Sequence, residues 1–252
     1  MIHFVGAGCG AADLITVRGK NLLEQADVII YAGSLVNSAL LDYKKEGCRV
    51  YDSAKMTLEE VLSVMFDAEA AGFDTVRLHT GDPCLYGAIR EQMDELDKKG
   101  IDYDYCPGVS AFSGAAAALK MEYTLPDISQ SVVITRMAGR TPVPERESVR
   151  SFAAHGTTMV LFLSAGLLEK TQTELLLGGY KEDTPAAIVY KASWPDEKTC
   201  LCTVGTLADC ARENGISKIA LIIVGDAVKQ SGYARSKLYD PTFSTEFRPA
   251  KE

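Results

Sequence analysis

The chain has 252 residues, of which 47% are hydrophobic and 24% are charged, so it can fill the core of one large domain or two small ones. Its formal net charge of −8 argues against a nucleic-acid-binding protein, which normally carries a basic face. Met1–Val5 runs straight into a glycine loop, unlike a secretory signal, and no apolar run approaches the ~20 residues that span a bilayer. These features predict a cytoplasmic protein with neither nucleic acid nor membrane as a partner.

The first half of the chain alternates short strands rich in β-branched residues with helical segments. Thr57 and Glu60 form the pattern of a capping box, which marks the start of a helix. The regular alternation of strand and helix is typical of a parallel sheet covered on both faces. The expected strands are 2–5, 28–31, 49–51, 75–78 and 103–106, and the expected helices are 14–25, 36–43, 57–70, 88–98 and 110–119.

A second α/β unit follows a connector around Tyr123–Asp127, where Pro126 disfavours a helix. Two of its strands follow one another without a helix between them, which predicts a hairpin and therefore a mixed sheet. The expected strands are 131–135, 158–163, 186–190, 199–203 and 219–224, and the expected helices are 145–154, 167–177 and 206–213. The predicted organisation is an N-terminal α/β domain (1–119), a linker (120–130), a C-terminal α/β domain (131–228) and a tail (229–252) whose aromatic residues predict that part of it docks.

The cysteines and histidines predict no metal site and no strong nucleophile. The seven cysteines are odd in number and form no C-x-x-C pair, and Cys200 and Cys202, on one face of a strand, fall short of the roughly four ligands of a structural zinc. Of three histidines, His3 and His79 lie on expected buried strands, where a satisfied core role is favoured. No nucleophile elbow, Walker loop or H-E-x-x-H is present, so the chemistry needs an already activated reactant, such as a sulfonium.

A glycine loop, Gly6–Ala11, directly follows the first strand and satisfies the dinucleotide fingerprint G-x-G-x-x-G/A. That fingerprint also requires a carboxylate at the end of the second strand, but Tyr31–Ser34 contains none. The loop therefore argues for a ligand other than NAD(P), or for a structural turn between strand and helix.

Three further loops carry candidate binding groups. In Thr80–Gly87, Gly81 lets a ligand approach the backbone, and Asp82 can accept hydrogen bonds, at a strand end where open α/β sheets bind ligands. In Pro107–Ala111, Ser110 can cap the following helix and leave amides for a ligand. In Arg136–Pro144, two arginines lie in a stiff loop and suit carboxylates. For each loop taken alone, a purely structural role is the alternative.

In order and spacing, Val5–Gly10, Thr80–Gly87 and Pro107–Ala111 resemble the tetrapyrrole methyltransferase family, and the resemblance runs over nearly the whole chain. It narrows to the branch that methylates C11 of precorrin-4 or cobalt-precorrin-4 in cobalamin synthesis. That branch is similar at Tyr31–Val36, His79–Pro83, Arg136–Pro144, Tyr190–Lys198 and Ser236–Pro241.

The resemblance implies two α/β domains with a cofactor cleft between them, a homodimer, S-adenosylmethionine as methyl donor and a corrinoid precursor as substrate. Tyr31 and Ser34 are expected to position the substrate, and Arg140 to bind its carboxylates. No residue is assigned as general base. The expected cofactor-binding residues are Cys9, Gly81, Asp82, Leu85, Ser110, Ala111, Leu163, Ala192 and Ala220.

The chain departs from the family at Cys9, which replaces a proline, and at Ala11 and Gly33, where relatives often carry aspartate. The implied reaction is an in-line attack of an enamine-like ring carbon on the methyl group. Three alternatives stay open: methylation at another ring position or of uroporphyrinogen III, protein methylation as by a diphthine synthase, and a non-catalytic corrinoid carrier.

Overall fold

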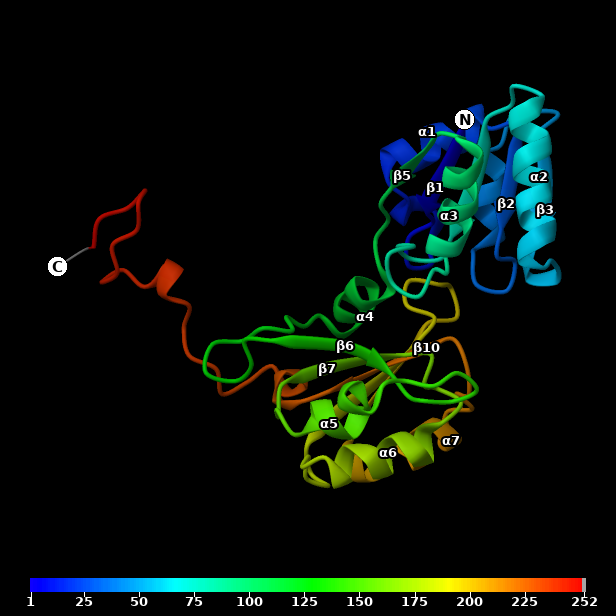
Figure 1. Cartoon of the computed structure of the whole chain (residues 1–252). Coiled ribbons are helices and arrows are strands. Elements are labelled where there is room, and N and C mark those ends of the chain that lie inside the picture. Colours follow the sequence, from blue (N-terminus) through cyan, green and yellow to red (C-terminus); the bar gives the residue numbers. More distant parts are fainter. Residues whose placement is uncertain (251–252) are drawn as a thin grey trace. The chain divides into compact units, whose positions relative to one another are not determined.

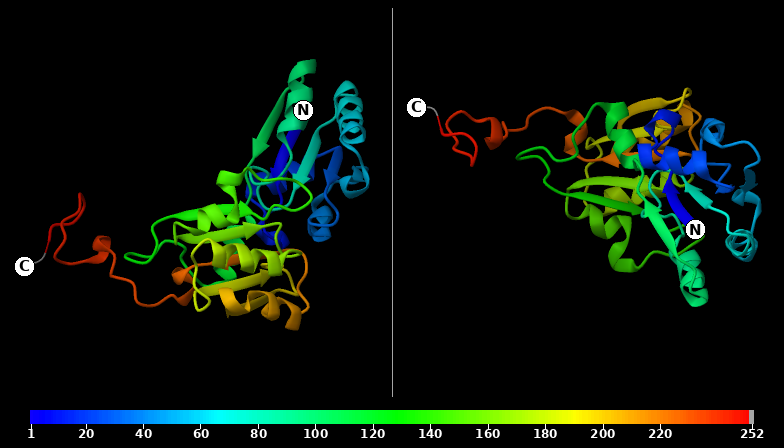
Figure 2. Two further views of the ribbon diagram at one scale, coloured as in Figure 1. Left: turned by 60° about the horizontal axis from the view of Figure 1, so that its bottom comes forward. Right: turned by 90° about the horizontal axis from the view of Figure 1, so that it is seen from above.

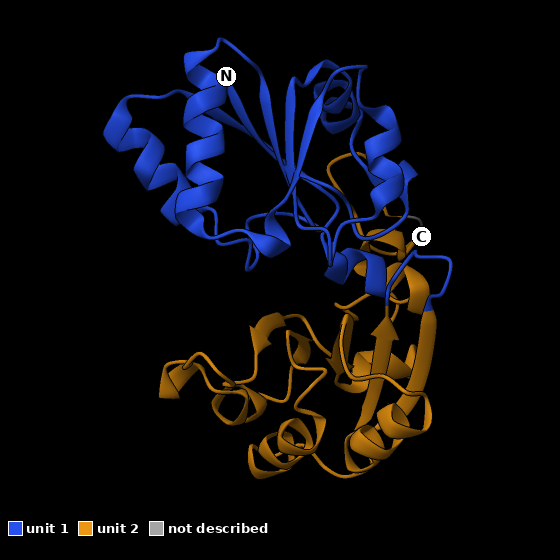
Figure 3. Cartoon of the chain, turned by 90° about the vertical axis from the view of Figure 1, so that its right-hand side faces the viewer, with its two compact units in different colours: residues 1–115, 191–197 blue, residues 116–190, 198–252 orange. Residues whose placement is uncertain are grey.

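The structure is a computed structural model that describes residues 1–250. The chain forms two compact units, coloured separately in Figure 3. Unit 1 contains Met1–Ala115 and Lys191–Glu197, and unit 2 contains Ala116–Tyr190 and the chain from Lys198 onward. The predicted linker, residues 116–119 and the predicted tail all cluster with unit 2, whereas Lys191–Glu197, from inside the predicted second domain, clusters with unit 1.

Unit 1 is a parallel five-stranded sheet in the order β3-β2-β4-β1-β5, as the alternating pattern predicted (Figure 1). Because all strands are parallel, their carboxyl ends lie at the same end of the sheet, and the loops that follow the strands meet there. The strands are β1 (Ile2–Gly6), β2 (Val28–Tyr31), β3 (Arg49–Asp52), β4 (Thr75–His79) and β5 (Tyr103–Cys106). The helices are α1 (Val17–Gln25), α2 (Leu58–Ala70), α3 (Arg90–Lys99) and α4 (Ala111–Leu119), the last of which crosses the boundary between the units.

Both faces of this sheet are buried, which explains the near-continuous apolar strands. Phe4 and Ile30 pack with Met65 of α2 and Leu96 of α3 on one face, while the other face packs against α1. The predicted capping box is confirmed, since the Glu60 amide donates to Thr57 Oγ1 at 3.3 Å and the Thr57 amide donates to Glu60 Oε2 at 2.7 Å.

Unit 2 holds a mixed five-stranded sheet in the order β6-β7-β10-β8-β9, and the predicted hairpin is confirmed as the antiparallel pair of β8 and β9. Strands β6 and β7 are parallel, and β10 runs antiparallel to β7 and β8. The strands are β6 (Val132–Arg136), β7 (Thr158–Phe162), β8 (Pro185–Tyr190), β9 (Lys198–Thr203) and β10 (Ala220–Val224). The helices are α5 (Val149–Ala153), α6 (Leu168–Leu177) and α7 (Leu207–Glu213).

Several predicted helices are shorter than expected because local capping interrupts them. The segment 145–154 divides into a 3-10 turn, Glu145–Glu147, and α5, because Ser148 is extended and accepts a hydrogen bond from the Ser151 amide at 3.2 Å. The predicted helix 14–25 begins only at Val17, after its cap Thr16, and the predicted helix 36–43 is a 3-10 turn, Ser38–Tyr43.

The first residues of the tail dock as predicted, since the Ala234 amide donates to the Pro126 carbonyl at 3.3 Å and Gln230 Nε2 donates to the Leu119 carbonyl at 2.8 Å. The rest of the tail extends away from the unit 2 sheet (Figures 1 and 2). It has turns of its own, since the Arg248 guanidinium donates to the Leu238 and Asp240 carbonyls at 2.9 and 2.8 Å. Its apolar side chains stay exposed nonetheless, Phe247 by 93%. Within residues 1–250, no helix combines the length and apolar character needed to cross a membrane.

Candidate active site

The loops after β1, β4 and β5 converge at the carboxyl end of the unit 1 sheet. The Gly81 amide donates to the Gly8 carbonyl at 2.8 Å, and the Gly8 amide donates back to the Gly81 carbonyl at 3.2 Å. A β-carbon on Gly6 would lie 2.6 Å from the Gly108 Cα, and one on Gly108 would lie 2.3 Å from the Gly81 carbonyl oxygen. Glycine is therefore required at these positions because three backbones meet without room for side chains.

The Asp82 side chain ties two of these loops together. Its Oδ1 accepts the Cys84 amide at 2.8 Å and the Tyr105 hydroxyl, and its Oδ2 accepts the Gly108 amide at 2.9 Å. Burial acts to raise the pKa of Asp82, but the hydrogen bonds from Tyr105, Cys84 and Gly108 outweigh it and hold that pKa below its ordinary value. Since a carboxylate has about four acceptor positions, most of them are used within the protein. The geometry supports a role in fixing the loops.

The backbones of Gly81 and Ala111 lie close together at the start of α4. Gly81 has a left-handed φ of +60°, and a β-carbon there would lie 3.2 Å from the Ala111 amide nitrogen. Ser110 is buried just before the helix, and Leu85 is half-buried on the loop after β4. Gly81 has no side chain that would obstruct a ligand approaching the Ala111 amide.

Cys9 and Ala192 close the same region from a segment far away in the sequence. The Cys9 thiol is buried, 3.5 Å from Ser193 Oγ, and the Ala11 amide donates to Ser193 Oγ at 2.9 Å. A β-carbon on Gly10 would lie 2.4 Å from the Ala192 carbonyl oxygen and 2.3 Å from the Trp194 ring. These contacts explain why Lys191–Glu197 belongs to unit 1, and they join Ala192 to the glycine loop.

The two remaining expected cofactor residues, Leu163 and Ala220, lie together at one end of the unit 2 sheet. Leu161 pairs with Ile222 across the antiparallel strands, so Leu163 follows β7 opposite the start of β10. Leu163 is 66% exposed with a φ of +52°, and Ile219 also has a φ of +52°. Left-handed backbone is costly for a β-branched residue and is concentrated at functional sites. This strain supports a binding role for this end of the sheet.

The arginines of the Arg136–Pro144 loop have different roles. The Arg136 guanidinium donates to the carbonyls of Met137, Thr141 and Pro142, at 3.2, 3.3 and 2.8 Å, and so shapes the loop. Arg140 is exposed and has no partner among residues 1–250. Arg140 is therefore the guanidinium that this loop leaves available for a ligand.

Tyr31 and Ser34 lie at the carboxyl end of β2. Tyr31 is half-buried, and its carbonyl accepts the Ser53 hydroxyl at 3.1 Å, while Ser34 is exposed. Gly33 between them donates its amide to Asp52 Oδ1 at 2.9 Å. Asp52 was not predicted as a site residue, because nothing in its local pattern links the end of β3 to Gly33. Tyr105, whose hydroxyl binds Asp82, was not predicted either, because no motif marks a tyrosine within a strand.

His79 is a core residue, but the prediction that its hydrogen bonds are satisfied is wrong. Its Nε2 is buried and has no partner within the described residues 1–250, and the ring stacks on Phe4 at 6.3 Å between centroids. Burial, with a smaller contribution from the Arg77 charge, lowers the pKa of His79 to about 3. The imidazole is neutral at ordinary pH. His3, by contrast, pairs through Nδ1 with Asp104 Oδ1 at 2.6 Å.

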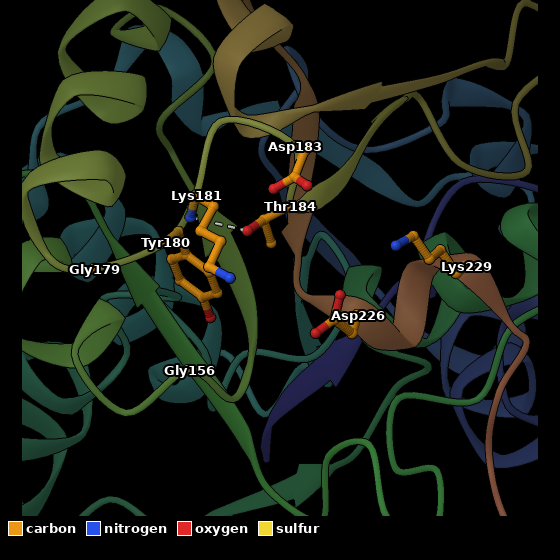
Figure 4. A pocket seen from close by; sticks show the side chains of 8 residues that line it. All are labelled: Gly156, Gly179, Tyr180, Lys181, Asp183, Thr184, Asp226 and Lys229. Carbon is orange, nitrogen blue, oxygen red and sulfur yellow. Dashed lines mark hydrogen bonds between the residues drawn. The ribbon is translucent and has the colours of Figure 1, made fainter.

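A polar pocket of about 280 Å³ lies at the end of the unit 2 sheet opposite Leu163 and Ala220 (Figure 4). Figure 4 shows Lys181, Asp183, Asp226 and Lys229 around it. None of the expected site residues lines this pocket. In the chain up to residue 250, no three or more His, Cys, Asp and Glu side chains are arranged to hold a metal ion.

Comparison with known proteins shows the family to which the chain is similar. The model of the tetrapyrrole (corrin/porphyrin) methylases matches residues 1–208. The cobalt-precorrin-4 C(11)-methyltransferase of Methanocaldococcus jannaschii is 53% identical over 247 residues, covering 98% of this chain and 95% of that protein.

Solved structures show the same fold. The X-ray structure of the cobalt-precorrin-4 methyltransferase CbiF, 48% identical, matches with a TM-score of 0.88 over 90% of this chain and 95% of that one. The uroporphyrin-III C-methyltransferase of Thermus thermophilus in complex with S-adenosyl homocysteine, 25% identical, matches with a TM-score of 0.77 over 91% of this chain and 99% of that one. The chain therefore belongs to the tetrapyrrole (corrin/porphyrin) methylases.

Proposed function

We propose that the protein is an S-adenosylmethionine-dependent methyltransferase that methylates C11 of precorrin-4 or cobalt-precorrin-4 in cobalamin biosynthesis. The observation that carries this proposal is the similarity to a relative with that activity over 98% of the chain, which includes all three converging loops and the Arg136–Pro144 loop. The reaction requires a bound methyl donor and a bound tetrapyrrole, and the loops of the two units supply candidate residues for both.

The residues around Gly81 suit S-adenosylmethionine. The Gly81 backbone and the Ala111 amide form a cradle that a β-carbon at Gly81 would fill. Such a cradle suits a cofactor that is held largely by backbone groups. When bound, the cofactor supplies a methyl group already activated by the sulfonium. We propose that the cofactor is held by Cys9, Gly81, Leu85, Ser110, Ala111 and Ala192 of unit 1 and by Leu163 and Ala220 of unit 2. Asp82 acts by holding the loops in position.

The tetrapyrrole carries several carboxylates, and we assign Arg140 to one of them because its guanidinium is exposed and unpaired in the described chain. Tyr31 and Ser34 position the macrocycle from the carboxyl end of β2. The protein's main contribution is to hold the ring carbon, the methyl group and the sulfur in line, which is worth about 7–11 kcal/mol in favourable cases. Exclusion of water strengthens the effect of fixed dipoles around the reacting atoms.

A competition experiment tests this substrate assignment. Purified protein receives labelled S-adenosylmethionine with equal amounts of precorrin-4 and uroporphyrinogen III. Label in the product of precorrin-4 alone is the expected result. Label in the product of uroporphyrinogen III would show that the substrate assignment is wrong and that the protein acts as another branch of the family does.

We further propose that the enzyme is a cytoplasmic homodimer whose tail contacts the partner copy. Leu238, Tyr239 and Phe247 are 67%, 71% and 93% exposed. Residues 229–250 carry four basic and two acidic side chains, against a net charge of −8 for the whole chain, so the tail complements the acidic remainder of a second copy. Light scattering of the full chain and of a chain truncated after Gln230 tests this: the full chain is expected to be a dimer and the truncated chain a monomer.

A further inference from the structure

Asp52 presents one carboxylate oxygen without a hydrogen bond at the carboxyl end of the unit 1 sheet, where the site loops gather. It is the last residue of β3 and the register partner of Tyr31 at the end of β2. Its Oδ1 accepts the amides of Gly33 and Ala54, at 2.9 and 3.0 Å. Its Oδ2 forms no hydrogen bond within the described chain, and its nearest cation is Lys55 Nζ at 3.9 Å. The carboxylate is thus fixed through one oxygen and available through the other.

Gly33 creates the space that Asp52 occupies. A β-carbon on Gly33 would lie 2.6 Å from Asp52 Oδ1 and 2.8 Å from Oδ2, so a side chain at position 33 and the Asp52 carboxylate exclude one another. The absence of a side chain at Gly33 therefore lets a carboxylate from β3 reach the loop Ala32–Val36. The hydrogen bonds from the Ala54 and Gly33 amides, of which the Ala54 bond has the larger effect, hold the pKa of Asp52 below its ordinary value. The carboxylate is therefore ionised at neutral pH.

The distance of Asp52 from the cofactor loop determines what it can contact. The strand order places β2 between β3 and β4, and neighbouring strands lie about 4.8 Å apart, so Asp52 is roughly 10 Å from the loop that follows β4. This separation is too large for a contact with the reacting methyl group held near Gly81. It suits the far side of a tetrapyrrole, whose ring N–H groups are donors that a carboxylate accepts.

We propose that Asp52 Oδ2 accepts a hydrogen bond from a ring N–H of metal-free precorrin-4 and stabilises the positive charge that methyl transfer places on that nitrogen. This inference rests on the proposed function. In the step, an electron pair of the ring enamine forms the bond to the methyl carbon, and the bond from that carbon to sulfur breaks. The sulfonium becomes a neutral thioether, and its charge passes to the ring N–H, which keeps its proton beside the Asp52 carboxylate. No oxidant or reductant is consumed.

The alternative role for Asp52 is structural, because it caps the 3-10 turn Ser53–Lys55. Asp52→Asn separates the two roles: its amide oxygen can still accept the Gly33 and Ala54 amides, while the negative charge is lost. The expected result is a fall in kcat of about 100-fold and weaker precorrin-4 binding in the presence of S-adenosylhomocysteine, with unchanged affinity for S-adenosylhomocysteine alone. Asp67→Asn, which removes the same charge from the exposed face of α2, is the matched control and is expected to leave all three quantities unchanged.

A swap variant strengthens the test. The double variant Asp52→Gly with Gly33→Asp exchanges the two residues, so the carboxylate now comes from position 33. This double variant is expected to recover part of the kcat lost in Asp52→Gly alone. Turnover of precorrin-4 by the wild-type protein is measured first. If the wild-type protein does not methylate precorrin-4, the proposed function itself is wrong. If wild type is active while Asp52→Asn keeps the wild-type kcat and precorrin-4 affinity, Asp52 has no substrate role and this inference is wrong.

Discussion

The Asp82 carboxylate accepts a hydrogen bond of 2.9 Å from the Gly108 amide and thereby joins the loop after β4 to the loop after β5. The Tyr105 hydroxyl donates to the other oxygen of the same carboxylate. Two loops distant in the sequence are therefore held by one side chain, and the glycine surface beside them depends on it.

Tyr105→Phe removes one donor to this carboxylate and keeps the aromatic ring. A hydrogen bond to a charged group contributes about 2 kcal/mol, so the free energy of unfolding in urea is expected to fall by about that amount. Affinity for S-adenosylhomocysteine should fall as well, because the loops lose a restraint. Tyr103→Phe is the control, since its hydroxyl binds Asp97 at the exposed surface. Equal losses in both variants would show that Asp82 does not depend on Tyr105.

Gly81→Ala places a methyl group on the proposed cofactor surface, 3.2 Å from the Ala111 amide nitrogen. At least a tenfold loss of S-adenosylhomocysteine affinity is expected by calorimetry, equivalent to about 1.4 kcal/mol. Gly72→Ala is a matched control, because Gly72 also has a left-handed φ, +70°, but open space around it. Both variants carry similar backbone strain, so unchanged affinity in Gly81→Ala would remove this loop from the cofactor site.

Arg140→Ala removes the exposed guanidinium of the Arg136–Pro144 loop. Binding of precorrin-4 should weaken about tenfold, while S-adenosylhomocysteine binding should not change, because the loss concerns only a carboxylate contact. Arg146→Ala, which also removes an exposed arginine, should leave both affinities as they are. Equal weakening of both ligands by Arg140→Ala would contradict its assignment to the tetrapyrrole.

His79 makes stability depend on pH. Its pKa is about 3 in the folded protein and near 6.5 in the unfolded chain, so the unfolded state binds more protons between these values. Stability should therefore fall as pH decreases from 6.5 towards 3, by about 1.4 kcal/mol per pH unit from this group. His79→Gln removes that contribution, and urea unfolding of both proteins at several pH values measures the difference. Parallel stability curves would show that His79 titrates normally.

Most elements of the fold follow from the sequence because apolar pattern and capping act locally. The strands Val28–Tyr31 and Tyr103–Cys106 have the predicted bounds, and the capping box at Thr57 forms as expected. Helix lengths were less predictable, as at Ser148, because a single serine can cap a helix inside an apparently helical segment.

The site was predictable where motifs follow strands. Gly81 and Ala111 meet because parallel strands end at one edge of the sheet. The contact between Gly33 and Asp52 was not predictable, because it joins two loops through the absence of a side chain. The docking of Ser193 on Ala11 was missed for a similar reason, since its two partners are 182 positions apart.

The most direct test is turnover of isotopically labelled S-adenosylmethionine with precorrin-4, with and without cobalt, followed by NMR to locate the new methyl group. The proposed function predicts label at C11 of the product, and the more rapidly methylated form identifies the natural metal state. Label at another ring carbon, or no transfer to either form by protein that binds S-adenosylhomocysteine, would contradict it.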